Sequence, residues 1–310
     1  MNVLEYLEKK ECYARFVSID HLEDLRDEVR DLHAKGQLES EFFVEWIQPR
    51  LHPKVPKGMS KAKSIMVAAI PSPALTTRFK WRSRTYDFTV PPTYGEYLRA
   101  SNRAWRLLKE ALAPKKYWIA RAILPVKLLA VRSGLACYGR NNVTFIPKYG
   151  SFHTLAALYT DYVSSEYHWQ DKKMMEKCAV CKACQKACPT GAIAGDRVLI
   201  HAERCLSRFN ERPSSKPFPS WINPSAHNSM IGCMHCQRVC PYDREIINWR
   251  EVRARFNEEE TEYLLRGRFS GERATRLDRR LKRAGLDLTS FPRNLEVLLK
   301  SRAAEAPRTG

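Results

Sequence analysis

Eight of the ten cysteines fall into two groups whose spacing is typical of iron–sulfur proteins. The first run is Cys178-Ala-Val-Cys181-Lys-Ala-Cys184-Gln-Lys-Ala-Cys188-Pro189, with the spacing C-x2-C-x2-C-x3-C-P of bacterial ferredoxins. In such a run the first three thiolates bind one [4Fe–4S] cluster. The fourth cysteine, followed by proline, turns away and binds the other cluster.

The second run, Cys233-Met-His-Cys236-Gln-Arg-Val-Cys240-Pro241, lacks the leading cysteine of that pattern. Cys205 lies upstream and can supply it, so eight ligands are available for two clusters. We expect the first cluster to take Cys178, Cys181, Cys184 and Cys240, and the second to take Cys188, Cys205, Cys233 and Cys236.

Zinc is the alternative metal, since a lone C-x2-C pair also suits a zinc site. Two runs that end in C-x3-C-P favour iron–sulfur clusters instead. Of the remaining cysteines, we interpret Cys12 as a small buried hydrophobe on a helix and Cys137 as a packing residue in a glycine-rich loop. His235 is expected to donate to a cluster sulfur rather than to bind iron.

The net charge of +19 is concentrated in two segments. Residues 99–148 hold 11 basic and 1 acidic side chains, and residues 266–308 hold 12 basic and 5 acidic ones. This pattern favours a polyanionic partner such as RNA or an anionic cofactor. Solvated helix faces that offset the negative charge of the clusters are an equally good interpretation.

Apolar periodicity predicts the elements that position these cysteines. We expect helices at 20–32, 95–112, 121–135 and 152–163, a buried strand at 63–71, a short strand at 197–201 and a helical pattern over 249–310. The predicted fold class is therefore α+β, with an α/β domain over 1–170, a double-cluster ferredoxin-like domain over 171–248 and a basic helical segment over 249–310.

The first sixteen residues, MNVLEYLEKKECYARF, are interrupted by charges, and no twin-arginine pair opens the chain. The most apolar long stretch, 117–138, contains three cations. Such cations are rare in a transmembrane helix. Ten cysteines without a secretory leader favour metal binding over disulfides. We expect a cytoplasmic protein that does not enter a membrane.

With these features in place, the chain resembles the epoxyqueuosine reductases, the cobalamin-dependent enzymes of tRNA queuosine synthesis, and more distantly the reductive dehalogenases. The resemblance covers about residues 55–248 and extends weakly through the basic C-terminal segment to about residue 300. It rests on the strand at 64–70, the stretch Val131-Arg132-Ser133-Gly134-Leu135, the following Gly139-Arg140-Asn141, the Gly150-Ser151 pair and both cysteine runs with Cys205 between them.

The resemblance implies a flavin-reductase-like N-terminal domain that binds cobalamin beside two [4Fe–4S] clusters. The clusters would reduce the corrinoid, which in turn reduces the substrate. Glycines let the backbone approach a bulky planar ligand, and arginine and asparagine can bond its amide rim. The residues implied in cobalamin binding are Gly134, Gly139, Arg140, Asn141, Gly150 and Ser151. The glycines would otherwise cap helices and form turns.

One family feature is missing from the sequence. The family carries a proton-donating aspartate about a dozen residues before the arginine that matches Arg132, and that position is Ala120 here. No Asp or Glu lies between Glu110 and Asp161. Tyr97 and Tyr138 are the candidate substitutes, because a tyrosine keeps its proton at neutral pH.

These features predict an oxidoreductase that takes electrons from an external low-potential donor and acts on a substrate carried by tRNA or on a small molecule. The alternative is an electron-transfer partner that reductively activates a corrinoid protein and has no substrate chemistry of its own. A membrane-linked reductive dehalogenase is disfavoured by the short chain and the lack of a twin-arginine leader.

Overall fold

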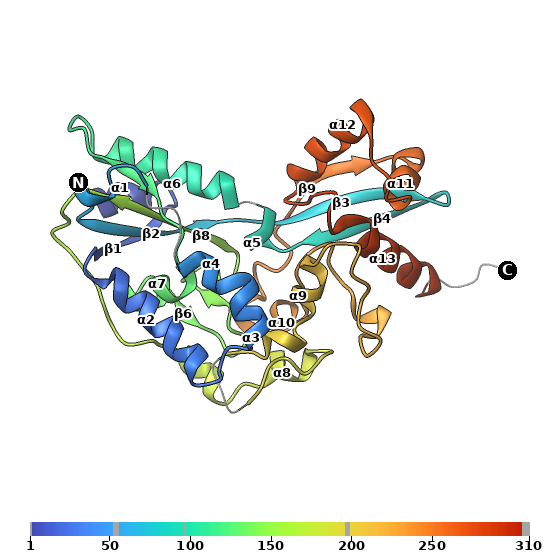
Figure 1. Ribbon diagram of the computed structural model, residues 1–310, viewed down its shortest axis with the longest axis horizontal. Coiled ribbons are helices and arrows are strands. Elements are labelled where there is room, and N and C mark those ends of the chain that lie inside the picture. Colours follow the sequence, from blue (N-terminus) through green and yellow to red (C-terminus); the bar gives the residue numbers. More distant parts are fainter. Residues whose placement is uncertain (1, 52–55, 96, 196–198, 306–310) are drawn as a thin grey trace.

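A four-stranded antiparallel sheet organises the N-terminal lobe (Figure 1). The computed structural model describes residues 2–51, 56–95, 97–195 and 199–305. The strands lie in the order β1-β2-β8-β5. Their bounds are β1 (Tyr13–Ser18), β2 (Ser64–Pro71), β5 (Ile119–Arg121) and β8 (His153–Thr160).

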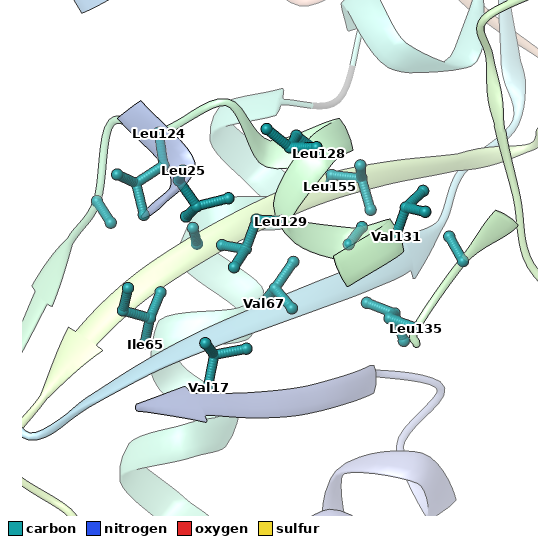
Figure 2. Packing of buried hydrophobic residues seen from close by; sticks show 14 of the residues in the cluster. Val17, Leu25, Ile65, Val67, Leu124, Leu128, Leu129, Val131, Leu135 and Leu155 are labelled. Carbon is teal, nitrogen blue, oxygen red and sulfur yellow. The ribbon is translucent and has the colours of Figure 1, made fainter. Parts of the chain in front are cut away.

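Both faces of this sheet are covered, because alternate residues of a strand point to opposite sides. From β2, Ile65 and Val67 face α2 (His21–Ala34) and α7 (Val126–Arg132). Met66 and Ala68 face α1 (Val3–Lys9) and α6 (Tyr97–Ala111). Figure 2 shows the first of these layers, in which Leu129 of α7 packs over Val67. The lobe is thus a helix–sheet–helix sandwich.

The helix expected at 152–163 is wrong, because this segment forms strand β8. Every residue of β8 is buried, since β2 and β5 flank it and helices cover both faces. A strand buried on both faces has a continuous apolar run, which periodicity cannot distinguish from a buried helix.

A second, three-stranded sheet forms the C-terminal lobe, in the order β4-β3-β9. It joins segments far apart in sequence, because β9 (Arg250–Phe256) runs parallel to β3 (Ala74–Trp81), which forms a hairpin with β4 (Arg84–Val90). The helical pattern expected over 249–310 is therefore wrong for Arg250–Phe256, which form strand β9. Covering helices are α11 (Glu258–Leu265), α12 (Gly271–Lys282) and α13 (Phe291–Glu305).

The cysteine segment lies beneath the junction of the two lobes (Figure 1). Its short helices are α8 (Ala183–Ala187), which holds Cys184, α9 (Leu206–Glu211), which follows Cys205, and α10 (His235–Arg238), which holds Cys236. Strands β6 (Cys137–Tyr138) and β7 (Thr144–Phe145) form a separate two-stranded sheet. The other helices are α3 (Ser40–Phe42), η1 (Phe43–Ile47), α4 (Gln48–Leu51), η2 (Met59–Lys61), α5 (Pro92–Gly95), η3 (Glu176–Ala179), η4 (Ala202–Arg204), η5 (Pro224–Ala226) and η6 (Pro241–Asp243).

Several predicted elements are confirmed. The structure has α2 at the helix expected over 20–32, β2 at the strand over 63–71 and α6 at the helix over 95–112. The helix expected at 121–135 is shorter, because Pro125 is its N-cap and α7 begins at Val126. The strand expected at 197–201 and the helical segment expected over 249–310 each fall partly outside the described residues. None of the described helices is long and apolar enough to span a membrane.

Candidate iron–sulfur site

The structure places the seven cysteines of the two runs and Cys205 close to one another, and none of them forms a disulfide. Electrostatic interactions show which of them are neighbours. Burial, together with negative charge on Cys205 and Cys188, raises the pKa of the Cys233 thiol to about 11. Burial likewise raises the pKa of Cys240 to about 12, with added effects of Asp243 and Cys178.

The remaining cysteines follow the same division. Burial raises the pKa of Cys184, and so do nearby Cys178 and Cys181. Cys236 lies near cysteines of both predicted cluster sets. Its pKa is raised by burial, by Cys233 and Cys205 of the second set, and by Cys184 of the first set. The two sets therefore lie side by side, as a shared double-cluster fold requires.

Among the described residues, no three His, Cys, Asp or Glu side chains converge on one point as ligands of a single ion would. A cubane differs from a single ion in this respect. Each of its four irons takes one protein thiolate, so the ligands surround a cage rather than a point. The absence of a convergent set among the described residues is therefore compatible with cluster ligands.

Arg140 ties the first cysteine loop to the N-terminal lobe. Its guanidinium is buried, and its Nε donates to the carbonyls of Cys178 and Cys181 at 3.1 Å each. Nη2 donates to the Cys178 and Ala179 carbonyls, and Nη1 to the Gly195 carbonyl at 3.2 Å. A rigid fork of donors thereby fixes the backbone of the loop that presents three thiolates.

Gly150 and Ser151 make a second connection, to the segment that follows Cys240. The buried Asp243 carboxylate accepts from the Ser151 N–H at 2.8 Å and from its hydroxyl at 2.7 Å. A Cβ on Gly150, which has φ +51°, would lie 2.2 Å from Asp243 Oδ1 and 2.8 Å from the Tyr242 carbonyl oxygen. Position 150 therefore requires glycine because the two segments approach so closely. Burial raises the pKa of Asp243, although the Ser151 bonds oppose that shift.

His153, the first residue of strand β8, fixes the turn at Gly150 through a hydrogen bond. Its ring is buried, with Nδ1 3.1 Å from the Gly150 carbonyl oxygen and Nε2 3.0 Å from Thr144 Oγ1. A carbonyl only accepts, so Nδ1 carries the proton and Nε2 accepts from the threonine hydroxyl. Burial lowers the pKa of His153 to about 4, which keeps the ring neutral.

A few donors reach cysteine sulfurs directly. The Ala192 N–H donates to Cys188 Sγ at 3.3 Å, and Asn228 Nδ2 donates to Cys233 Sγ at 3.6 Å. The Asn141 side chain bonds Cys236 and lowers its pKa against the effect of burial. Asn228 was not singled out from the sequence, because nothing in its local pattern marks it. His235, expected as such a donor, has its Nε2 bonded to the Ala226 carbonyl at 2.9 Å.

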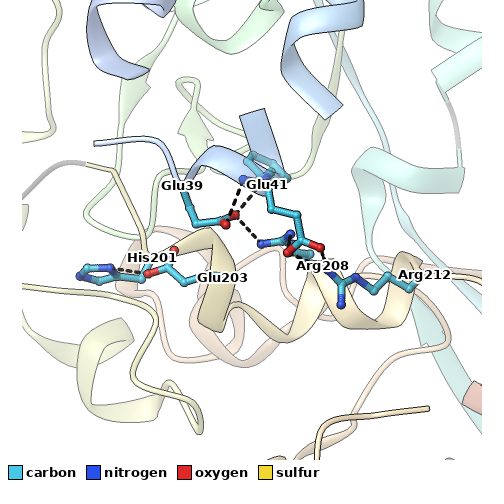
Figure 3. A network of polar contacts seen from close by, with 7 residues as sticks. Glu39, Glu41, His201, Glu203, Arg208 and Arg212 are labelled. Carbon is cyan, nitrogen blue, oxygen red and sulfur yellow. Dashed lines mark hydrogen bonds and ion pairs between the residues drawn. The ribbon is translucent and has the colours of Figure 1, made fainter. Parts of the chain in front are cut away.

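Helix α9, which begins directly after Cys205, is fixed to the N-terminal lobe by Arg208 (Figure 3). The buried guanidinium pairs with Glu39 at 2.8 Å and with Glu41 at 2.7 Å. Burial alone would raise the pKa of Glu39, but the Phe42 and Glu41 N–H groups and Arg208 lower it below its usual value. The ligand that completes the second set from a distance thus has a rigid support.

The two tyrosines predicted as proton donors lie apart. Tyr97 is 46% exposed on α6, whereas Tyr138 is buried in the core beneath α7, where burial raises its pKa well above the usual range. Tyr94, three residues before Tyr97, lies closer to the cysteines. Its hydroxyl donates to Glu211, and its pKa is raised by burial, by Glu211 and by Cys205.

Lys127 is a second residue near Cys205 that the sequence did not single out. Its Nζ donates to the carbonyl and to Oδ1 of Asn142, both at 3.1 Å. Burial lowers its pKa against the opposing effect of Cys205 and Glu211. The side chain nevertheless remains accessible to solvent.

The segment between Cys205 and Cys233, with prolines at 213, 217, 219 and 224, contributes to a pocket. Trp221, which is 53% exposed, lines a pocket of about 560 Å³ beside the segment that follows Cys188. The other lining residues are Pro189, Thr190, Gly191, Glu203 and Arg204. None of the residues predicted to bind cobalamin lines this pocket.

Cys12 and Cys137 lie outside the two thiol sets. Cys12 is fully buried, as expected, but it follows α1 instead of lying on a helix. Burial raises its pKa to about 12, so it remains a thiol at neutral pH. Cys137 lies on β6 and is partly exposed.

Comparisons with known proteins agree with this site. Residues 177–243 match the family model of the 4Fe-4S double cluster binding domain, which confirms the predicted pair of [4Fe–4S] clusters. The epoxyqueuosine reductase of Bacillus subtilis is 28% identical over 265 residues, which are 79% of this chain and 65% of that protein. The Escherichia coli enzyme is 32% identical over 116 residues, 37% of this chain and 29% of its own length.

Solved structures extend the similarity to the fold. Epoxyqueuosine reductase from Streptococcus thermophilus aligns with a TM-score of 0.64 at 20% identity, covering 97% of this chain and 80% of that one. An epoxyqueuosine reductase bound to an epoxyqueuosine-modified tRNA stem loop aligns with a TM-score of 0.63 at 22% identity, covering 96% and 80%. The chain spans just under two thirds of the length of the Bacillus subtilis relative. The chain is therefore a relative of the epoxyqueuosine reductases that contains a double [4Fe–4S] cluster domain.

Proposed function

We propose that this chain is an iron–sulfur oxidoreductase that passes low-potential electrons through two [4Fe–4S] clusters to a corrinoid, and from there to a substrate carried by tRNA or to a small molecule. The observation that carries the proposal is the division of eight thiols into two adjacent sets within a double-cluster domain. We assign the first cluster to Cys178, Cys181, Cys184 and Cys240, and the second to Cys188, Cys205, Cys233 and Cys236.

When bound, each cluster accepts and releases one electron at low potential. The chain holds the cluster-binding loops with Arg140 and Asp243 and donates hydrogen bonds to sulfur from Asn228 and Asn141. We place the clusters in a domain over 171–248, between a flavin-reductase-like domain over 1–170 and the segment 249–310, in a cytoplasmic protein.

The residues predicted to hold the corrinoid do not fit that role in this structure. Arg140 is occupied by carbonyls of the first cysteine loop, and Ser151 by Asp243. A Cβ on Gly139 would meet the protein's own Phe145 ring at 2.6 Å, and Gly134 ends helix α7 with φ +72° against Gln170. A corrinoid bound by this chain would therefore need polar side chains other than those of Arg140 and Ser151.

This disagreement favours a second candidate function, in which the chain reduces a corrinoid carried by another protein. The lack of any Asp or Glu between Glu110 and Asp161 points the same way, because the family's proton donor has no counterpart there. In that case the chain transfers electrons and performs no substrate chemistry.

For the substrate, tRNA is favoured by the relative that was solved with a tRNA stem loop. Exposed cations lie on α6 and directly after it, at Arg106, Lys109 and Lys115. Lys109 Nζ lies 5.3 Å from the centre of the Trp105 ring, which is itself partly exposed. Aromatic rings interleaved with cations suit a nucleic acid.

The test is cobalamin binding by the anaerobically reconstituted protein, followed by turnover of an epoxyqueuosine-modified tRNA stem loop. Corrinoid bands that co-purify with the chain, together with conversion of the stem loop, would support the first function. No affinity for any corrinoid would refute it. A stable complex with a corrinoid protein, without turnover of tRNA, would support the second function.

A further inference from the structure

An exposed apolar residue lies at the centre of the first cysteine loop. Val180, between Cys178 and Cys181, is 84% exposed, although Cys178 itself is buried. Tyr242, two residues after Cys240, is 41% exposed and lies near Cys178 and Cys240, whose charges raise its pKa in addition to the larger effect of burial. Both residues therefore lie at the surface directly over the first thiol set.

Exposed lysines surround this apolar centre. Lys177 lies with Nζ 5.7 Å from the centre of the Tyr242 ring. Lys182 and Lys186 are four residues apart at α8, so they lie on one face of that helix. Within the described residues, none of these three ammonium groups forms an ion pair with a carboxylate. We call Val180, Tyr242, Lys177, Lys182 and Lys186 the first-cluster face.

An apolar centre with a charged rim is the composition of a protein interface, and weak redox encounters use small ones. Exposed Glu176 also lies near Tyr242, but the three lysines keep the rim positive overall. A positive rim attracts a negatively charged partner and raises the association rate. We propose that an acidic one-electron carrier protein docks on the first-cluster face, so that electrons enter at the first cluster and leave from the second. This proposal rests on the proposed function, because it requires an external electron donor.

The transfer itself is simple to balance. The reduced carrier loses one electron and the oxidised first cluster gains it, with no bond made or broken. The electron then passes to the second cluster, which lies beside the first because the two thiol sets share one fold. Close docking matters because the carrier's redox centre must approach the cluster, and Val180 lies within the loop that would bind it.

RNA is the competing occupant of a basic surface. Figure 1 shows α8 at the lower edge of the molecule, whereas α6 and α12 lie along its upper edge. The lysines of the first-cluster face are thus remote from the helices with the densest exposed cations. Val180, at the centre of the face, is aliphatic, so Tyr242 is the ring that the face offers for base stacking. These features favour a protein partner here.

The test uses the cluster-loaded chain and a reduced plant-type [2Fe–2S] ferredoxin as the acidic probe, with cluster reduction followed by anaerobic stopped flow. A triple variant, Lys177→Glu, Lys182→Glu and Lys186→Glu, should slow reduction by about tenfold or more and abolish its salt dependence. The matched control, Arg276→Glu, Arg279→Glu and Arg283→Glu, makes the same change of charge on exposed residues at α12 and should stay within about twofold of the parent.

Photoreduced deazaflavin, which needs no docking surface, should reduce the clusters of all three proteins at equal rates. If the glutamate variant loses its clusters, the milder Lys→Gln triple replaces it and should still weaken the salt dependence. Equal rates for the parent and the face variant, or equal slowing by both triples, would overturn the proposal. Loss of tRNA binding without loss of ferredoxin reactivity would assign the face to RNA. No substrate is needed, so failure of the proposed function would leave this result unaffected.

Discussion

Asn228 shows how single side chains tune the site. Its Nδ2 donates to Cys233 Sγ, while its Oδ1 accepts from the Met234 N–H at 3.0 Å. One amide therefore shapes the loop and also stabilises negative charge on a cluster ligand. Because hydrogen bonds to sulfur raise the potential of a cluster, Asn228 would make the second cluster easier to reduce under the proposed ligand assignment.

We predict that Asn228→Asp shifts the potential of the second cluster to a more negative value. The substitution keeps an oxygen for Met234 but removes the N–H donor to sulfur. Loss of one hydrogen bond of about 0.5–1.5 kcal/mol corresponds to about 20–65 mV for a one-electron couple. An EPR-monitored redox titration measures the shift. Asn223→Asp adds the same charge at an exposed position and should change the potential less; equal shifts in both variants would contradict this role.

His153 gives the fold a dependence on pH. Its pKa falls from 6.5 to about 4 on folding, so the unfolded state binds the proton more tightly. The stabilisation is therefore fully present above about pH 6.5 and is lost as the pH falls toward 4. Since one pKa unit is worth about 1.4 kcal/mol, the full loss is about 3 kcal/mol.

A His153→Gln variant should therefore lose less stability than the parent between pH 6.5 and pH 4.5. Thermal unfolding of the cluster-loaded proteins under argon measures this difference, and acid lability of the clusters affects both proteins alike. Parallel loss of stability in the two proteins would show that His153 does not titrate on unfolding.

At the scale of elements, the glycine-rich turns from 139 to 151 support the cysteine loops. Arg140 reaches Cys178, and Ser151 reaches Asp243, through hydrogen bonds that span 38 and 92 positions of sequence. Removing Arg140 would leave several carbonyls of the first cysteine loop without partners, and unpaired buried groups cost about 1–3 kcal/mol each.

We predict that Arg140→Met selectively destabilises the first cluster. Iron content should fall toward about half of the parent value, because the second set of ligands does not depend on this guanidinium. Chemical iron analysis with the visible spectrum checks the result, and Arg268→Met, at an exposed position, is the control. Full iron content in the Arg140 variant would show that Arg140 is not needed to hold the first cysteine loop.

The cysteine runs could be predicted from sequence because each places three ligands within a short segment, so local spacing carries the chemistry. Arg140 could not be assigned in this way, since its partners are carbonyls distant in sequence. Strand β8 was missed because burial on both faces removes alternation. In β9, alternation was present, with Ala254 and Phe256 buried and Arg255 exposed, but the surrounding helical pattern concealed it.

At the scale of the whole molecule, exposed charge divides between two regions. The upper edge in Figure 1 carries the cations of α6 and α12, and the lower edge carries the lysines of the first-cluster face. The two lobes meet above the cysteine segment, so a substrate and an electron donor could bind from different sides. Such a division lets both partners be present at the same time.

We predict that Arg106→Gln, Lys109→Gln and Lys115→Gln together weaken binding of a tRNA stem loop and lower its dependence on salt. Each lost phosphate contact reduces the slope of log affinity against log salt by about 0.7–0.9. Fluorescence anisotropy over a salt series measures the slope. The Lys177→Gln, Lys182→Gln and Lys186→Gln triple removes equal charge and should leave the slope unchanged; the same loss in both triples would indicate general electrostatic attraction.

The most direct test of the whole account is the EPR spectrum of the anaerobically reconstituted and reduced protein, read together with its iron content. Two cluster sets that share one domain should give signals of two magnetically interacting [4Fe–4S] centres, with iron for both. A single isolated cluster, or zinc in place of iron, would contradict the electron path on which the proposed function depends.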